Sequence, residues 1–184
     1  MTSESGQVQP TDAALVGRAR DGDGAAFRSL VDRHAPRLFA MAAAFVGSHA
    51  DAEDIVQETL AGAFRGLRTF EGRSSVKTWL TGILIRQTAM HRRRRRRRET
   101  TVLPLETGTA LPSPTRAVDV RIDVMAAIQS LSPEHRDVIV LREIEGLSYD
   151  EMAETLGVPR GTVESRLFRA RRRLQERLTG YLDD

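Results

Sequence analysis

The chain has 184 residues, of which 40% are hydrophobic and 29% are charged, a composition typical of a folded protein rather than a disordered one. Its formal net charge is only +3, but its 28 basic residues, all arginine except Lys77, give a sequence pI of about 10.1. The absence of cysteine excludes disulfide bonds and thiolate metal sites, and it is compatible with a reducing cytoplasm.

The N-terminal residues 1–10, MTSESGQVQP, lack the basic start and apolar core of a signal peptide, and we expect them to form a disordered tail. No apolar run approaches the roughly 18 residues that are needed to span a bilayer. We therefore predict a cytoplasmic protein that does not insert into a membrane.

Apolar residues recur with helical spacing along almost the whole chain, and no segment alternates convincingly with a period of two. Helices are predicted at residues 11–20, from about residue 25, and from near residue 48. Pro36 is expected to kink or restart the second of these helices.

The third predicted helix has two different faces. Its apolar face consists of Val56, Leu60, Ala63, Phe64 and Leu67. Its other face is polar and rich in acids, and consists of Asp54, Gln57, Glu58, Ala61 and Arg65. Acids in the first turn, such as Asp51, suit the positive end of the helix dipole.

A break at residues 69–75, TFEGRSS, precedes a helix that is predicted to begin at about Val76 and to continue into seven consecutive arginines, residues 92–98. Residues 49–60 carry four acids and no lysine or arginine, whereas residues 86–98 carry eight arginines and no acid. A run of like charges is usually solvated. A nuclear targeting tag is one alternative explanation for the seven arginines. The asymmetry indicates one surface for a basic partner and another for a polyanion.

Residues 99–117 contain three prolines and no periodic pattern, and are predicted to be a linker. A second helical domain, residues 118–179, contains a helix-turn-helix pattern within residues 148–178. A capping box, Ser148 to Glu151, begins a helix that ends at Gly157, and a longer helix follows the turn GVP. That longer helix carries an apolar stripe of Val163, Leu167, Ala170 and Leu174.

Charge supports a nucleic-acid-binding function for the longer helix. Residues 131–157 have two arginines and seven acids, whereas residues 158–178 have seven arginines and two acids. An ordinary helical hairpin with a solvated face is the alternative. The predicted fold class is all-α, with two small helical domains, 11–98 and 118–179, joined by a flexible linker.

Three stretches resemble one known family: DAEDIVQETLAGAFRGLRTF at 51–70, EGRSSVKTWL at 71–80, and LSPEHRDVIVLREIEGLSYDEMAETLGVPRGTVESRLFRARRRL at 131–174. In this order they resemble bacterial RNA polymerase sigma factors of the sigma-70 family, in the extracytoplasmic-function (ECF) group. The resemblance covers about residues 11–98 and 121–178. It implies that 11–98 is sigma region 2, that 118–179 is sigma region 4, and that core RNA polymerase and promoter DNA are the partners.

In the family, the helix that matches residues 51–70 docks on the largest catalytic subunit of core polymerase. The resemblance therefore implies that Asp54, Gln57 and Glu58 contact core polymerase. These residues belong to the acid-rich face described above, and a merely solvated face is the alternative for them.

The family also melts the minus-ten promoter element and captures an unstacked base, which requires stacking surfaces and short hydrogen-bonding groups. The implied minus-ten contacts are Phe70, Arg73, Ser74, Ser75, Lys77, Trp79, Arg86, Arg92 and Arg93. Trp79 is equally compatible with a position in the core. The arginine run would lie along flanking phosphates. Arg86 and Met90 depart from the family, which often has asparagine and aspartate in this helix.

The second domain of the family reads the minus-thirty-five element with its recognition helix. The implied contacts are Arg160, Thr162, Glu164, Ser165, Arg166, Phe168, Arg169 and Arg172. Arginine reads guanine best, with two hydrogen bonds, and Arg172 is expected to hold phosphate. Relatives often have a basic residue at the position of Glu164. Glu164 is expected to read a DNA base, to orient the neighbouring Arg160, or merely to pair with Arg160.

An enzyme is not expected. The four histidines are scattered outside metal-ligand spacing, and no phosphate-binding glycine loop or nucleophile motif appears. We predict no cofactor and no metal. The other hypothesis is a stand-alone helix-turn-helix regulator that binds duplex DNA as a dimer. An anti-sigma factor, which many relatives have, is a possible further partner, and association with the bacterial nucleoid would follow from polymerase binding.

Overall fold

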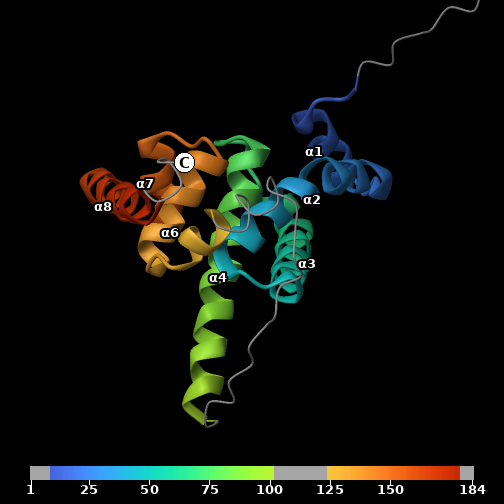
Figure 1. Ribbon diagram of the computed structural model, residues 1–184. Coiled ribbons are helices and arrows are strands. Elements are labelled where there is room, and N and C mark those ends of the chain that lie inside the picture. The colour runs from blue at the N-terminus through green and yellow to red at the C-terminus, as the bar shows by residue number, and fades with distance from the viewer. Residues whose placement is uncertain (1–8, 102–123, 179–184) are drawn as a thin grey trace, which may run out of the picture.

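The computed structural model describes residues 9–101 and 124–178, and within these ranges it contains helices and no strand (Figure 1). The predictions for residues 1–8 and 102–123, which include the start of the predicted second domain, and for residue 179 lie outside the described residues. The elements of the first domain are α1 (Asp12–Arg20), α2 (Gly24–Val46), α3 (His49–Gly66), the 3-10 turn η1 (Leu67–Thr69) and α4 (Val76–Thr101).

Local capping explains where the first three helices begin. The side-chain oxygens of Thr11, Asp23 and Ser48 accept hydrogen bonds from backbone amides in the first turns of α1, α2 and α3. At Asp23 the amide of Ala26 is the main cause of a lowered carboxyl pKa, and hydrogen bonding from Arg18 acts in the same direction. Short polar residues between apolar runs therefore set these boundaries, as the sequence predicted.

Two expectations about this domain need correction. Pro36 does not restart α2, which continues as one helix to Val46, because apolar residues on both sides of it, including Leu30 and Leu38, are buried in the same core. Phe64, which was placed on the apolar face of the third predicted helix, is 59% exposed, and its ring meets that of Phe27 edge-on with the centroids 5.0 Å apart. In addition, α4 extends to Thr101, three residues beyond the predicted domain boundary.

The second domain contains a helical segment at residues 124–129, followed by α6 (Pro133–Ile139), the π-helical turn η2 (Val140–Ile144), α7 (Tyr149–Leu156) and α8 (Arg160–Leu178). The predicted capping box of Ser148 and Glu151 is confirmed, and Gly157 ends α7 in the left-handed conformation at φ 65°. Val163, Leu167 and Ala170 of α8 are buried, which confirms the predicted stripe. These features form a helix-turn-helix.

The two domains pack against each other. Figure 1 shows α6, α7 and α8 on one side of α4 and α1, α2 and α3 on the other, while the C-terminal end of α4 extends beyond both groups. The carboxylate of Glu145, which follows η2, is fully buried and accepts hydrogen bonds from Arg37 of α2 and Thr81 of α4. Lys77 Nζ donates to the backbone oxygen of Glu145 at 2.9 Å.

Two further groups of contacts hold the domains together. Arg92 of α4 donates to both carboxylate oxygens of Asp137 of α6. Arg136 Nη1 donates to the backbone oxygen of Phe45 at 2.6 Å, and Gln129 Nε2 donates to that of Ala44, also at 2.6 Å. The C-terminal end of α2 is thus capped by side chains of the second domain, which satisfy carbonyl groups that the helix itself leaves without a partner.

Candidate nucleic-acid interface

The recognition helix α8 carries the residues that were predicted to read the minus-thirty-five element. Val163, Leu167 and Ala170 fix one face of α8 against α6 and α7, so the opposite face is exposed. Phe168 is 70% exposed. The exposed predicted residues are Arg160, Glu164, Ser165, Phe168, Arg169 and Arg172, whereas Thr162 and Arg166 are half-buried.

Arg160 is held by two acids. Its Nε donates to Glu164 at 2.9 Å, and its Nη1 lies 3.1 Å from each carboxylate oxygen of Asp150 on α7. Its guanidinium also lies over the ring of Tyr149, 5.8 Å from the centroid. The hydrogen bond to Glu164, followed by that to Asp150, raises the pKa of Arg160. This contact is compatible with two of the roles considered for Glu164, namely orientation of the neighbouring arginine and simple pairing with it.

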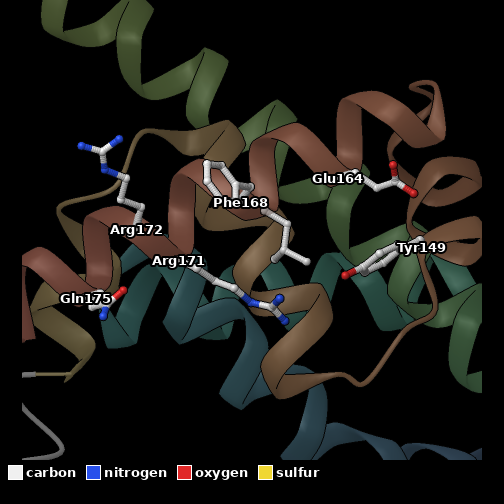
Figure 2. Close-up of a pocket in the computed structure, with 7 residues that line it drawn as sticks. Tyr149, Glu164, Phe168, Arg171, Arg172 and Gln175 are labelled. Atoms are coloured by element: carbon white, nitrogen blue, oxygen red, sulfur yellow. The ribbon is translucent and has the colours of Figure 1, made fainter.

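A groove of about 640 Å³ runs along α8 (Figure 2). It is lined by Tyr149, Glu164, Leu167, Phe168, Arg171, Arg172 and Gln175. Figure 2 shows Arg171 extending toward Tyr149, whereas Arg172 points away from it. Arg171 pairs with Glu143 at 2.7 Å, and Arg172 pairs with Glu176 at 2.9 Å. Sequence reasoning missed Tyr149, Asp150 and Arg171, because their approach to the recognition face depends on how α7 and η2 pack on α8.

The acid-rich face of α3 is exposed as predicted. Asp54, Gln57 and Glu58 are all exposed, while Ile55, Val56 and Thr59 of the same helix are buried. The apolar side of α3 packs on α2 and α4. The three polar side chains are therefore available to a partner in this conformation.

In the loop before α4, the position of Phe70 differs from the prediction that it offers a stacking surface. Phe70 is only 9% exposed, and its ring centroid lies 4.5 Å from that of Trp79, so Phe70 is a core residue here and not an open stacking surface. Trp79 is half-buried and packs against the same core. Ser75 accepts a hydrogen bond from the amide of Thr78 at 3.0 Å and so serves the first turn of α4. Arg73, in contrast, is highly exposed and pairs with Glu71.

The remaining predicted minus-ten residues lie on α4 or just before it, in two different environments. Arg86 and Arg93 are exposed, and Ser74 in the preceding loop is half-buried. Lys77 and Arg92 are engaged with Glu145 and Asp137 of the second domain. The closed arrangement thus occupies two of the cations that were predicted to contact promoter DNA.

The described residues lack other kinds of site. Within 9–101 and 124–178, the structure has no group of three or more histidine or acidic side chains that could hold a metal ion. None of the helices in these ranges combines the length and the hydropathy that a membrane span requires.

These features define a two-domain helix-turn-helix DNA-binding protein. Its second domain carries an exposed basic recognition helix, and its first domain carries an acidic face and a run of arginines. Residues 30–98 match the family model of sigma-70 region 2, and residues 121–174 match that of sigma-70, region 4. The chain belongs to the sigma-70 family and, by its relatives, to the ECF group of RNA polymerase sigma factors.

The relatives match over most of their length. The chain is 37% identical to ECF RNA polymerase sigma factor SigE of Mycolicibacterium smegmatis, covering 97% of this chain and 74% of the relative. It is 34% identical to the ECF RNA polymerase sigma-E factor of Escherichia coli, and the match covers 92% of this chain and 95% of the relative. Among solved structures, the sigma factor RpoE of Bartonella quintana, in complex with the anti-sigma factor NepR, superposes with a TM-score of 0.73 at 34% identity, covering 83% and 96%.

Proposed function

We propose that this sigma factor binds core RNA polymerase through α3, reads the minus-thirty-five element with α8 and melts the minus-ten element with the loop before α4 and with α4 itself. The exposed face of α8 carries the proposal, because its arginines, Ser165 and Phe168 follow a capped α7 in the arrangement with which such domains enter the major groove. Promoter recognition follows from the family. The residue roles are our proposal.

The proposed docking of core polymerase rests on Asp54, Gln57 and Glu58. Two carboxylates and one amide on one exposed helix face suit a basic partner surface, with charge steering the encounter and the amide giving directional hydrogen bonds. We assign no chemical reaction to the chain itself. Through polymerase it would be cytoplasmic and associated with the bacterial nucleoid.

Two of the proposed contacts to the minus-ten element are also contacts between the two domains. Arg92 is largely buried in its pair with Asp137, and Lys77, although its side chain is 46% exposed, pairs with Glu145. Bound DNA would therefore favour an open arrangement in which these cations are released. An anti-sigma factor is a further proposed partner, since the similar RpoE structure contains one.

Run-off transcription with purified core polymerase on fragmented genomic DNA tests this function. We expect transcripts with defined start sites only when the chain is added, and a one-to-one complex of chain and core enzyme. Binding of duplex DNA by a dimer of the chain, with no transcript that depends on core polymerase, would instead establish the stand-alone regulator.

A further inference from the structure

The first turns of α7 and α8 meet around one arginine. Arg160 is the first residue of α8, and Tyr149 and Asp150 are the first two residues of α7. The capping box fixes this turn of α7, because the amide of Ser148 donates to the carboxylate of Glu151 at 2.8 Å and the amide of Glu151 donates to the hydroxyl of Ser148 at 3.3 Å. Asp150 is therefore held by a capped helix start beside the recognition helix.

Three side chains contact the guanidinium of Arg160. Its Nε donates to Glu164 at 2.9 Å, its Nη1 lies 3.1 Å from each carboxylate oxygen of Asp150, and its Cζ lies 5.8 Å from the ring centroid of Tyr149. Its Nη2 has no hydrogen-bond partner among residues 9–101 and 124–178. We call Glu164, Asp150 and Tyr149 the Arg160 clamp.

The engaged nitrogens decide which contacts Arg160 can make with DNA. A guanidinium has two planar donor pairs, Nε with Nη2 along one edge and Nη1 with Nη2 at its end, and either pair matches the O6 and N7 acceptors of guanine. Glu164 engages one member of the first pair, and Asp150 engages one member of the second. While both acids are in place, Arg160 keeps only Nη2 for an outside acceptor.

We propose that Asp150 is a specificity-determining residue for the minus-thirty-five element, because together with Glu164 it prevents Arg160 from reading guanine with two nitrogens. This inference rests on the proposed reading of that element by α8. Donation from one nitrogen can be accepted by N7 of either purine or by O4 of thymine, and so it discriminates less between bases than a two-nitrogen contact. Removal of the Asp150 carboxylate should therefore sharpen base selection beside Arg160.

The contacts of the Arg160 clamp reinforce one another. Asp150 is 75% exposed and Arg160 is 56% exposed, and an isolated ion pair at such positions is worth little. Here one guanidinium has two carboxylate partners and also lies over an aromatic ring, which adds a cation–π contact. Tyr149 is half-buried, and Arg142 lies 5.3 Å from the centroid of the same ring, so the ring is itself supported.

Transcription by core RNA polymerase with the full chain, from a promoter library randomised in the minus-thirty-five element, tests the Arg160 clamp. We expect Asp150→Ala to enrich guanine at one position by about fivefold or more, which corresponds to the lower end of the discrimination of a bidentate contact. Arg160→Ala in the Asp150→Ala background should abolish this enrichment, because the released guanidinium causes it.

Glu154→Ala is the matched control for charge. Glu154 is an exposed acid on the same helix, one turn beyond Asp150, and it is not a partner of Arg160 within the described part of the chain. Loss of either acid should raise the affinity for DNA of any sequence. We expect Glu154→Ala to change base preference by less than about twofold at every position. Circular dichroism of both variants checks that α7 stays folded.

Three results would overturn the Arg160 clamp: an unchanged base preference in Asp150→Ala, a guanine enrichment that persists when Arg160 is also replaced, or an equal enrichment in Glu154→Ala. Arg169→Ala separates such a failure from a failure of the proposed function. If Arg169→Ala relaxes the selected sequence while Asp150→Ala leaves it unchanged, α8 reads DNA and only the clamp is wrong. If neither variant alters the selection, the proposed reading by α8 is wrong as well.

Discussion

Arg92 on α4 donates hydrogen bonds to both carboxylate oxygens of Asp137 on α6, at 3.1 Å and 2.9 Å, across the boundary between the two domains. The residues are 45 positions apart in sequence, and each side chain is about one-fifth exposed. A bidentate, partly desolvated pair is more stabilising than a surface ion pair. A cation predicted to contact the promoter thus has an internal partner when the domains are packed.

We expect Asp137→Ala to loosen the domain contact by about 1–2 kcal/mol, between the values for exposed and buried pairs. Spin labels placed by Glu53→Cys on α3 and Glu154→Cys on α7, both exposed positions, should then report a larger population of long distances, and promoter affinity in the presence of core polymerase should rise. Glu134→Ala, which removes an exposed acid of α6, is the control for charge alone. An identical rise in both variants would indicate a simple electrostatic effect.

Glu145→Ala should be more disruptive, because it leaves the charge of Arg37 at the domain boundary without its buried carboxylate. We expect the free energy of separating or unfolding the domains to fall by about 3–5 kcal/mol. Urea titration followed by domain-specific labels measures this change. Glu143→Ala is the control: its side chain is half exposed and pairs with Arg171 on the surface, so its removal should cost less than about 1 kcal/mol.

Gln57→Ala with Glu58→Ala should weaken binding to core polymerase while the fold stays intact, since both side chains are exposed on α3. Titration of labelled chain with core enzyme gives the affinity, and circular dichroism checks the fold. Glu71→Ala, an exposed acid in the loop before α4, is expected to have little effect. If the α3 double variant binds core polymerase with unchanged affinity, the docking face lies elsewhere.

Substitutions in α8 should have distinguishable effects on transcription from a promoter library that is randomised in the minus-thirty-five element. Arg169→Ala should cost about 1–3 kcal/mol and relax preference at one position if it forks to guanine. Arg172→Ala should lower activity almost evenly across promoters, as loss of a phosphate contact predicts. Glu164→Ala should alter preference at the same position as Arg160→Ala, because Glu164 accepts a hydrogen bond from that guanidinium. Unchanged selected sequences in the Arg169 and Glu164 variants would show that α8 is not the reading helix.

Stability should fall on mild acidification because of His135. Burial, and then the charge of Arg173, lowers the pKa of this imidazole, so the unfolded chain takes up the proton at a higher pH than the folded chain. The stabilisation is therefore complete above about pH 6.5 and is lost as the pH falls toward the folded pKa. The free energy of unfolding of His135→Gln should change less between about pH 7.5 and 5.5 than that of the unsubstituted chain or of His49→Gln, whose side chain is exposed. An equal change in all three would contradict this role.

Much of the fold was determined by local sequence signals. Ser148, Glu151 and Gly157 set the bounds of α7 through hydrogen bonds and a left-handed residue within one short segment, and the apolar stripe of α8 follows from helical geometry alone. The exposed acids of α3 were likewise predictable, because their neighbours at core spacing are apolar. These features depend on residues a few positions apart, which a sequence displays directly.

Only the tertiary structure decided the features that depend on distant residues. The burial of Phe70 against Trp79, the support of Arg160 by Asp150 and the pairing of Arg92 with Asp137 each join different helices or loops. Sequence periodicity shows which face of a helix is apolar but not which helix covers it. The domain contact is the clearest case. Its ion pairs form because cations on α2 and α4 lie opposite Glu145, which follows η2, and Asp137 of α6, and no local sequence pattern predicts that these residues meet.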